Sequence, residues 1–137
     1  MEILVIIGIL GILTIMTIPA LRTFQFGLQL NGVSRELISD LRYAQQLTVT
    51  EQVEYCVLFF SIDKKYQIIQ CGESQPIKEK ILPNEIKSLT TAGFSNDEVR
   101  YNPYGAVKEA GSITLENTKN ETKTILVRPS GFVKISD

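Results

Sequence analysis

The sequence contains no histidine and no tryptophan, and it has only two cysteines among its 137 residues. Without histidine, the chain lacks the side chain that most often serves as a general base or a metal ligand. It also contains no nucleophile elbow, no phosphate-binding loop and no cluster of metal ligands. The sequence therefore predicts no enzyme, no metal site and no cofactor. The formal net charge of −1 argues against general binding of polyanions.

Charged residues are also absent from residues 3–21, which read ILVIIGILGILTIMTIPAL between Glu2 and Arg22. A helix needs about 20 apolar residues to cross a bilayer, so this run predicts a transmembrane helix. It is longer than the apolar core of about 7–15 residues in a secretory signal peptide. The membrane prediction depends on this run and includes Ile3, Gly8, Gly11, Pro19 and Leu21.

The helix is expected to continue beyond the apolar run. Pro19 removes a backbone donor and disfavours helix at the residue before it, so we expect a kink or local melting over residues 12–19. From Arg22 to about Thr50, apolar residues recur at steps of three and four, which indicates one face of an amphipathic helix. The predicted apolar stripe consists of Leu30, Val33, Leu37, Leu41, Ala44 and Leu47.

Two β-rich runs, VEYCVLFFS and YQIIQC, flank residues 62–65 and predict a β-hairpin. If those four residues form the loop, Cys56 lies opposite Cys71 in a non-hydrogen-bonded pair, where side chains approach closely. We therefore predict a cross-strand disulfide, which suits an oxidising compartment outside the cytoplasm. Two unrelated buried thiols are the alternative.

The segment at residues 72–97 contains two prolines, two glycines and several charges, so we expect a loop with a short strand or turn near residues 86–89. Asn96, Asp97 and Glu98 are potential metal ligands. Three adjacent residues cannot surround a cation by themselves, so a solvated turn is the expected structure.

The C-terminal third alternates between apolar and polar residues and predicts a three-stranded antiparallel meander with one buried face. The fold class is α+β, with a long N-terminal helix packed on a small antiparallel β-sheet domain. The predicted strands are residues 112–117, 122–128 and 132–136, after a short strand at 99–102. The expected parts are a transmembrane or filament-core helix at 1–21, an amphipathic helix at 22–51 and a β domain at 52–137.

An acid, an apolar run with a proline near its end, an amphipathic continuation and a β domain together resemble the type IV pilin and pseudopilin family. The matching residues are Glu2, the run from Ile3, and Pro19. The segments LISDLRYAQQLT and GSITLENTKNETKTILVRPSGFVKI and the predicted hairpin are most similar to the GspH/FimT group of minor pilins and pseudopilins. The resemblance implies the pilin fold.

The resemblance also implies a structural subunit of a type IV pilus-like or type II secretion filament. Such a subunit starts in the bacterial cytoplasmic membrane as a single-pass protein with its C-terminal domain outside the cytoplasm. It then joins a periplasmic or cell-surface filament. The implied partners are other pilin or pseudopilin subunits, the membrane, the assembly machinery and, for the precursor, prepilin peptidase. Glu2 would pair with the N-terminal amine of a neighbouring subunit; a solvated acid at a helix N-terminus is the alternative.

Two other functions stay open. Some relatives in the FimT branch capture DNA through a basic C-terminal region, so the chain is alternatively an adhesin or DNA-uptake receptor of a natural transformation pilus. Arg128 and Lys134 are the candidate contacts. From residue 99 onward, however, six basic residues face four acidic ones, and Phe132 stands where the family ending has an arginine. A solitary membrane-anchored domain is the third possibility.

Overall fold

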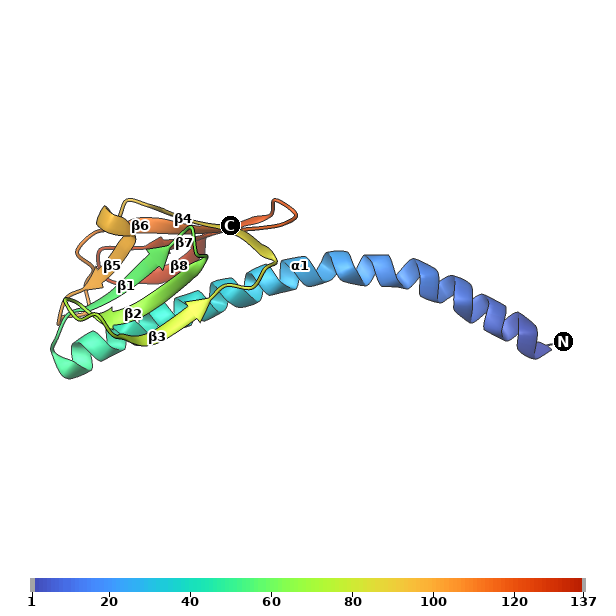
Figure 1. Cartoon of the computed structure of the whole chain (residues 1–137), viewed down its shortest axis with the longest axis horizontal. Coiled ribbons are helices and arrows are strands. Elements are labelled where there is room, and N and C mark those ends of the chain that lie inside the picture. The colour runs from blue at the N-terminus through green and yellow to red at the C-terminus, as the bar shows by residue number, and fades with distance from the viewer. Residues whose placement is uncertain (1, 137) are drawn as a thin grey trace.

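The computed structural model describes residues 2–136, except for the side chains of Glu2, Met16 and residues 18–23. One long helix leads into a small domain of antiparallel strands (Figure 1). The elements are α1 (Glu2–Glu51), β1 (Tyr55–Phe60), β2 (Lys65–Gln70), β3 (Pro76–Ile81), β4 (Ile86–Ala92), η1 (Ser95–Asp97), β5 (Glu98–Tyr101), β6 (Gly111–Asn117), β7 (Thr122–Val127) and β8 (Val133–Ser136).

Helix α1 runs without interruption for 50 residues, which corresponds to about 75 Å. Figure 1 shows a gently curved rod whose second half lies along the β domain and whose first half projects beyond it. The predicted local melting over residues 12–19 is therefore wrong. Proline removes one hydrogen bond of the helix, and long helices commonly accommodate such a loss by bending.

The second half of α1 packs on the β domain through the predicted stripe. Five of its six residues are buried, which confirms the helical periodicity, and Leu47 is half-buried. Their neighbours in the core come from both sheets and include Val57, Ile68, Ile113 and Ile125. Burying each such side chain contributes about 1.5–3 kcal/mol, so this face fixes the helix to the domain.

The β domain contains two four-stranded antiparallel sheets within the described residues, in the orders β3-β2-β1-β5 and β4-β6-β7-β8. The predicted meander is confirmed as β6, β7 and β8. The expectation of a loop at residues 72–97 is wrong for residues 76–81, which form the edge strand β3. The short strand expected near residues 86–89 is confirmed as the edge strand β4. The α+β fold class is confirmed.

The β1–β2 hairpin has a different register from the predicted one. Its turn occupies residues 61–64, one residue earlier, so Cys56 lies opposite Ile69 and not opposite Cys71. Cys71 follows the end of β2, where its N–H donates to the carbonyl oxygen of Glu54 (2.9 Å). The two cysteines are thus diagonal neighbours on one face. Their Cα atoms are 5.3 Å apart, and a disulfide joins them.

Candidate functional site

The first turns of α1 carry a concentration of exposed apolar side chains. Residues 3–15, which we name the apolar end, lie in the part of the helix that projects beyond the domain (Figure 1). Because a helix completes a turn in 3.6 residues, these side chains occupy all its sides. Ten large apolar side chains are each more than half exposed: Ile3, Leu4, Val5, Ile6, Ile7, Ile9, Leu10, Ile12, Leu13 and Ile15.

A helix that is apolar on all sides is normally surrounded by apolar material, either lipid or other protein. Each of these side chains gains up to about 1.5–3 kcal/mol when it leaves water. Within the described residues, the β domain does not cover the apolar end. The segment is therefore built to be covered by something other than its own domain.

The few small and polar residues of this region do not interrupt its apolar surface. The hydroxyls of Thr14 and Thr17 donate to the backbone carbonyls of Leu10 and Leu13, each at 2.7 Å. No donor hydrogen of these hydroxyls is left for solvent. No neighbouring side chain of the described chain lies within 4 Å of the position where Gly8 or Gly11 would carry a Cβ, so a second helix could approach there.

Several predicted functional residues fall outside this description. The side chains of Glu2, Pro19 and Leu21 are not among the described ones, although their backbone belongs to α1. No helix in the described part of the chain is long and apolar enough to cross a membrane.

A polar cluster around the buried Asp40 ties the second half of α1 to β2 and β3. Asp40 is only 4% exposed; it accepts hydrogen bonds from the Tyr66 hydroxyl (2.7 Å) and the Lys78 ammonium (2.6 Å). Glu36, one helical turn earlier, pairs with Lys80 (2.7 Å). Burial, followed by the hydrogen bond to Asp40, raises the pKa of Tyr66 far above its usual value. The carboxylates of α1 thus hold an edge strand in place.

The two candidate DNA contacts lie close together at the ends of β7 and β8. The N–H of Arg128 donates to the carbonyl oxygen of Phe132 (2.9 Å), and Lys134 lies opposite Leu126. Arg128 and Lys134 are both exposed, and neither forms an ion pair with another described residue. The structure brings together two cations, which is fewer than a phosphate backbone normally requires.

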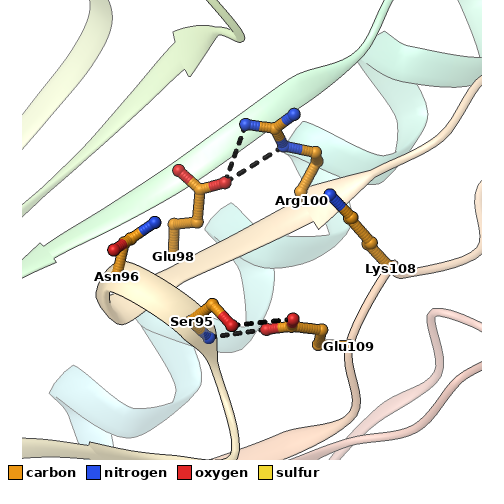
Figure 2. A pocket seen from close by; sticks show the side chains of 6 residues that line it. All are labelled: Ser95, Asn96, Glu98, Arg100, Lys108 and Glu109. Carbon is orange, nitrogen blue, oxygen red and sulfur yellow. Dashed lines mark hydrogen bonds and ion pairs between the residues drawn. The ribbon is translucent and has the colours of Figure 1, made fainter.

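A polar hollow of about 110 Å³ lies beside η1 and β5 (Figure 2). Its charged groups are largely satisfied by one another. The Arg100 guanidinium bonds Glu98 (Nε 3.0 Å, Nη2 2.9 Å), and the Ser95 hydroxyl and N–H both donate to Glu109. The two bonds from Ser95 lower the pKa of Glu109 below its usual value. The side chains of Lys108 and Asn96 also line the hollow, and neither bonds another described residue (Figure 2).

The triplet Asn96-Asp97-Glu98 does not converge on one point. Asp97 accepts a hydrogen bond from Thr91, while Glu98 turns to Arg100 (Figure 2). Asn96 and Asp97 have positive φ angles, 58° and 53°, which are typical of a tight turn. Among the described residues, no group of acidic or cysteine side chains is arranged to bind a metal ion.

The fold is shared with solved structures of minor pilins and pseudopilins. The minor pseudopilin EpsH of the type 2 secretion system of Vibrio cholerae matches with a TM-score of 0.67 and 9% identity, over 79% of this chain and 96% of EpsH. The type IV minor pilin FimU of Pseudomonas aeruginosa matches with a TM-score of 0.65 and 12% identity, over 79% of this chain and 88% of FimU.

Sequence comparison gives the family. No curated protein matches the chain. The family described as type II transport protein GspH, however, matches residues 33–131, which extend from the middle of α1 to the turn before β8. This stretch contains the buried helix face from Val33 onward, every described strand except β8, and the disulfide. The chain belongs to the GspH family of type II transport proteins.

Proposed function

We propose that this chain is a structural subunit, a minor pilin or pseudopilin, of a type II secretion or type IV pilus filament. One observation carries the proposal: ten large apolar side chains at the apolar end are exposed on all sides of a projecting helix. In a filament, the equivalent helices of neighbouring subunits would surround this segment and bury it. The partners are therefore other pilin or pseudopilin subunits.

Before assembly, the same segment would be held in the bacterial cytoplasmic membrane, with the β domain outside the cytoplasm. Two features support this order. Residues 3–21 carry no charge, and an oxidising compartment suits the Cys56–Cys71 disulfide. The assembly machinery would move the subunit from lipid to filament, after prepilin peptidase has acted on its precursor.

Glu2 would specify how a subunit docks in the filament. A carboxylate at the end of an apolar helix is costly to bury unless it is paired. The proposed partner is the N-terminal amine of a neighbouring subunit, which would satisfy the charge and set the axial position of the helix.

The function is structural and not enzymatic. The matching family is described as type II transport protein GspH, and EpsH, which shares the fold, is a minor pseudopilin. The shape of the molecule suits assembly: an anchored β domain at one end of a helix and an uncovered apolar segment at the other (Figure 1).

The experiment compares sheared filaments from cells that express the wild type, Glu2→Ala or Glu73→Ala. The last is a control that removes an exposed acid from the β2–β3 connection. We expect the wild type and the control in the filament fraction and Glu2→Ala in the membrane fraction. A wild type that never leaves the membrane would favour the solitary anchored domain.

A second function, DNA uptake or adhesion, rests on the exposed and adjacent Arg128 and Lys134. Its test is the binding of the full chain, in detergent micelles, to duplex DNA over a range of salt concentrations. DNA bound through several phosphates would dissociate steeply as salt rises. Weak binding with little salt dependence would exclude DNA uptake through these two residues.

A further inference from the structure

The outer face of sheet β4-β6-β7-β8 carries an unusual group of side chains where β7 meets β8. The strand register places Arg128 opposite Phe132, and Leu126 opposite Lys134. Side chains alternate along a strand, so these four point away from the core that contains Val127 and Val133. Two cations thus flank an apolar strip on one exposed surface.

The connection at residues 102–106, which carries Tyr104, lies against the connection between β7 and β8. The Val107 N–H donates to the carbonyl oxygen of Pro129 (3.1 Å), which brings the two connections into contact. Tyr104, in the first connection, is 91% exposed, and Phe132, which follows the second, is 52% exposed. We name Tyr104, Leu126, Arg128, Phe132 and Lys134 the basic aromatic surface.

Hydrogen bonds fix the backbone of the connection that carries Tyr104. Gln45 of α1 donates to the carbonyl oxygen of Gly105 (2.7 Å), and Asn102 accepts the N–H groups of Tyr104 (3.0 Å) and Ala106 (3.1 Å). Gly131 has a positive φ of 81°, and a side chain there would collide with both Gly105 and Gln45. A preformed surface loses little conformational entropy on binding, which favours recognition.

The surface lies at the end of α1 that is opposite to the apolar end. Gln45 lies near the C-terminal end of α1, and Figure 1 shows that this end is opposite to the apolar end. The interface that would cover the apolar end is therefore separate from the basic aromatic surface. An interaction here does not depend on the proposed assembly function.

The charges of the surface indicate the chemistry of its partner. Arg128 and Lys134 form no ion pair with any other described residue, so both can pair with acids from outside the chain. Tyrosine and arginine are also the residue types that most often dominate protein–protein binding energy. A nucleic acid would require a longer basic track, whereas two cations beside an apolar strip match a short acidic segment.

We infer that the basic aromatic surface is a docking site for another protein, and that it binds an acidic segment containing an aromatic or aliphatic side chain. Carboxylates of the segment would pair with Arg128 and Lys134. Its apolar side chain would lie against Phe132, Leu126 and Tyr104. The rigid connections would define the direction of the bound segment.

The test measures binding of the full chain, in detergent micelles, to an array of twelve-residue peptides that vary only in their numbers of acidic and aromatic residues. We expect affinity to rise with both numbers. Arg128→Glu with Lys134→Glu should weaken the best peptide by about tenfold or more, and Phe132→Ala by about fivefold. Arg35→Glu is the matched control, because Arg35 is an exposed cation on α1 outside this surface.

Far-UV circular dichroism and thermal melting would verify that each variant remains folded. Affinity that does not depend on acidic residues, or that survives the double charge reversal, would overturn the inference. So would binding of a twelve-nucleotide oligothymidylate more tightly than the best peptide, because the surface would then belong to a nucleic-acid site. We expect Glu2→Ala to lose filament assembly and to keep peptide binding. The two proposals can therefore be refuted independently of each other.

Discussion

Two buried tyrosines of this small domain differ in whether their hydroxyl groups have a hydrogen-bond partner. The Tyr66 hydroxyl donates to the buried carboxylate of Asp40, whereas the Tyr101 hydroxyl has no partner among the described residues. Removing a donor from a buried carboxylate is costly, but removing an unsatisfied hydroxyl is not. The same chemical change should therefore have different consequences at the two sites.

We predict that Tyr66→Phe lowers the free energy of unfolding by about 1–3 kcal/mol, because Asp40 loses one of its two partners. Tyr101→Phe should leave it unchanged or raise it by up to about 1 kcal/mol. Chemical denaturation of the full chain in mild detergent measures both. Equal losses at the two positions would contradict this assignment.

The same tyrosines predict how stability depends on pH. Burial raises the pKa of Tyr66 and of Tyr101 above the value of about 10 expected in the unfolded chain. As pH rises, the unfolded chain loses these protons first. The free energy of unfolding that these groups contribute is therefore present below about pH 10 and is lost above it. The free energy of unfolding between pH 8 and pH 11.5 should fall less steeply in the variant that carries both phenylalanines. Identical slopes would show that other groups cause the loss.

At the scale of elements, the joint between α1 and the sheets holds the domain together. Leu37 is fully buried in this joint, whereas Leu28 on the same helix is more than half exposed. Leu37→Ala should lower the free energy of unfolding by about 2–5 kcal/mol, since it leaves a cavity in the core. Leu28→Ala is the control and should change it by less than about 0.5 kcal/mol. Denaturant midpoints would rank the two variants. A larger loss of stability in Leu28→Ala than in Leu37→Ala would contradict the assignment of Leu37 to the joint.

The disulfide constrains the β1–β2 hairpin, and its two cysteines are 15 positions apart in the sequence. Replacing Cys56 and Cys71 together by serine should lower the free energy of unfolding by about 2–4 kcal/mol, because the unfolded chain gains freedom. Urea denaturation of the oxidised wild type and of the double variant provides the comparison. If the midpoints coincide, the disulfide has no stabilising role.

The sequence predicted the elements with strong periodicity and missed those without it. The stripe from Leu30 to Ala44 recurs at steps of three and four, and the strands β6 to β8 alternate between apolar and polar residues. Both predictions are confirmed. Strand β3 reads PIKEKI and has no buried face, so its sequence shows no apolar periodicity. Ion pairs from Lys78 and Lys80 to α1 hold it in position. Only the tertiary structure supplies those partners.

The hairpin register was missed for a related reason. A shift of one residue in the turn moves every cross-strand partner, and the composition of residues 61–65 does not distinguish the two turns. The disulfide forms in either case, since cysteines can meet directly or diagonally across neighbouring strands.

For the molecule as a whole, the candidate assembly surface could be predicted from the sequence and the basic aromatic surface could not. The apolar end is a continuous run, so composition alone shows it. The basic aromatic surface combines Tyr104 with residues 126–134, which only the strand pairing and the contact between connections bring together.

The molecule combines a β domain packed on the second half of a helix with a first half that projects beyond the domain (Figure 1) and carries exposed apolar side chains. The central claim of the proposed function is that helices of other filament subunits cover the apolar end. The most direct measurement places a photo-crosslinking amino acid at Leu10 in living cells and identifies the covalent products. A control at Glu73 places the same group on the exposed β2–β3 connection.

With the assembly machinery active, we predict that the group at Leu10 crosslinks to the N-terminal helices of other pilin or pseudopilin subunits. These products should disappear when the assembly ATPase is inactivated, and the Glu73 position should not yield them. Products with lipid alone, in assembling and non-assembling cells alike, would contradict the claim and show that the apolar end never leaves the membrane.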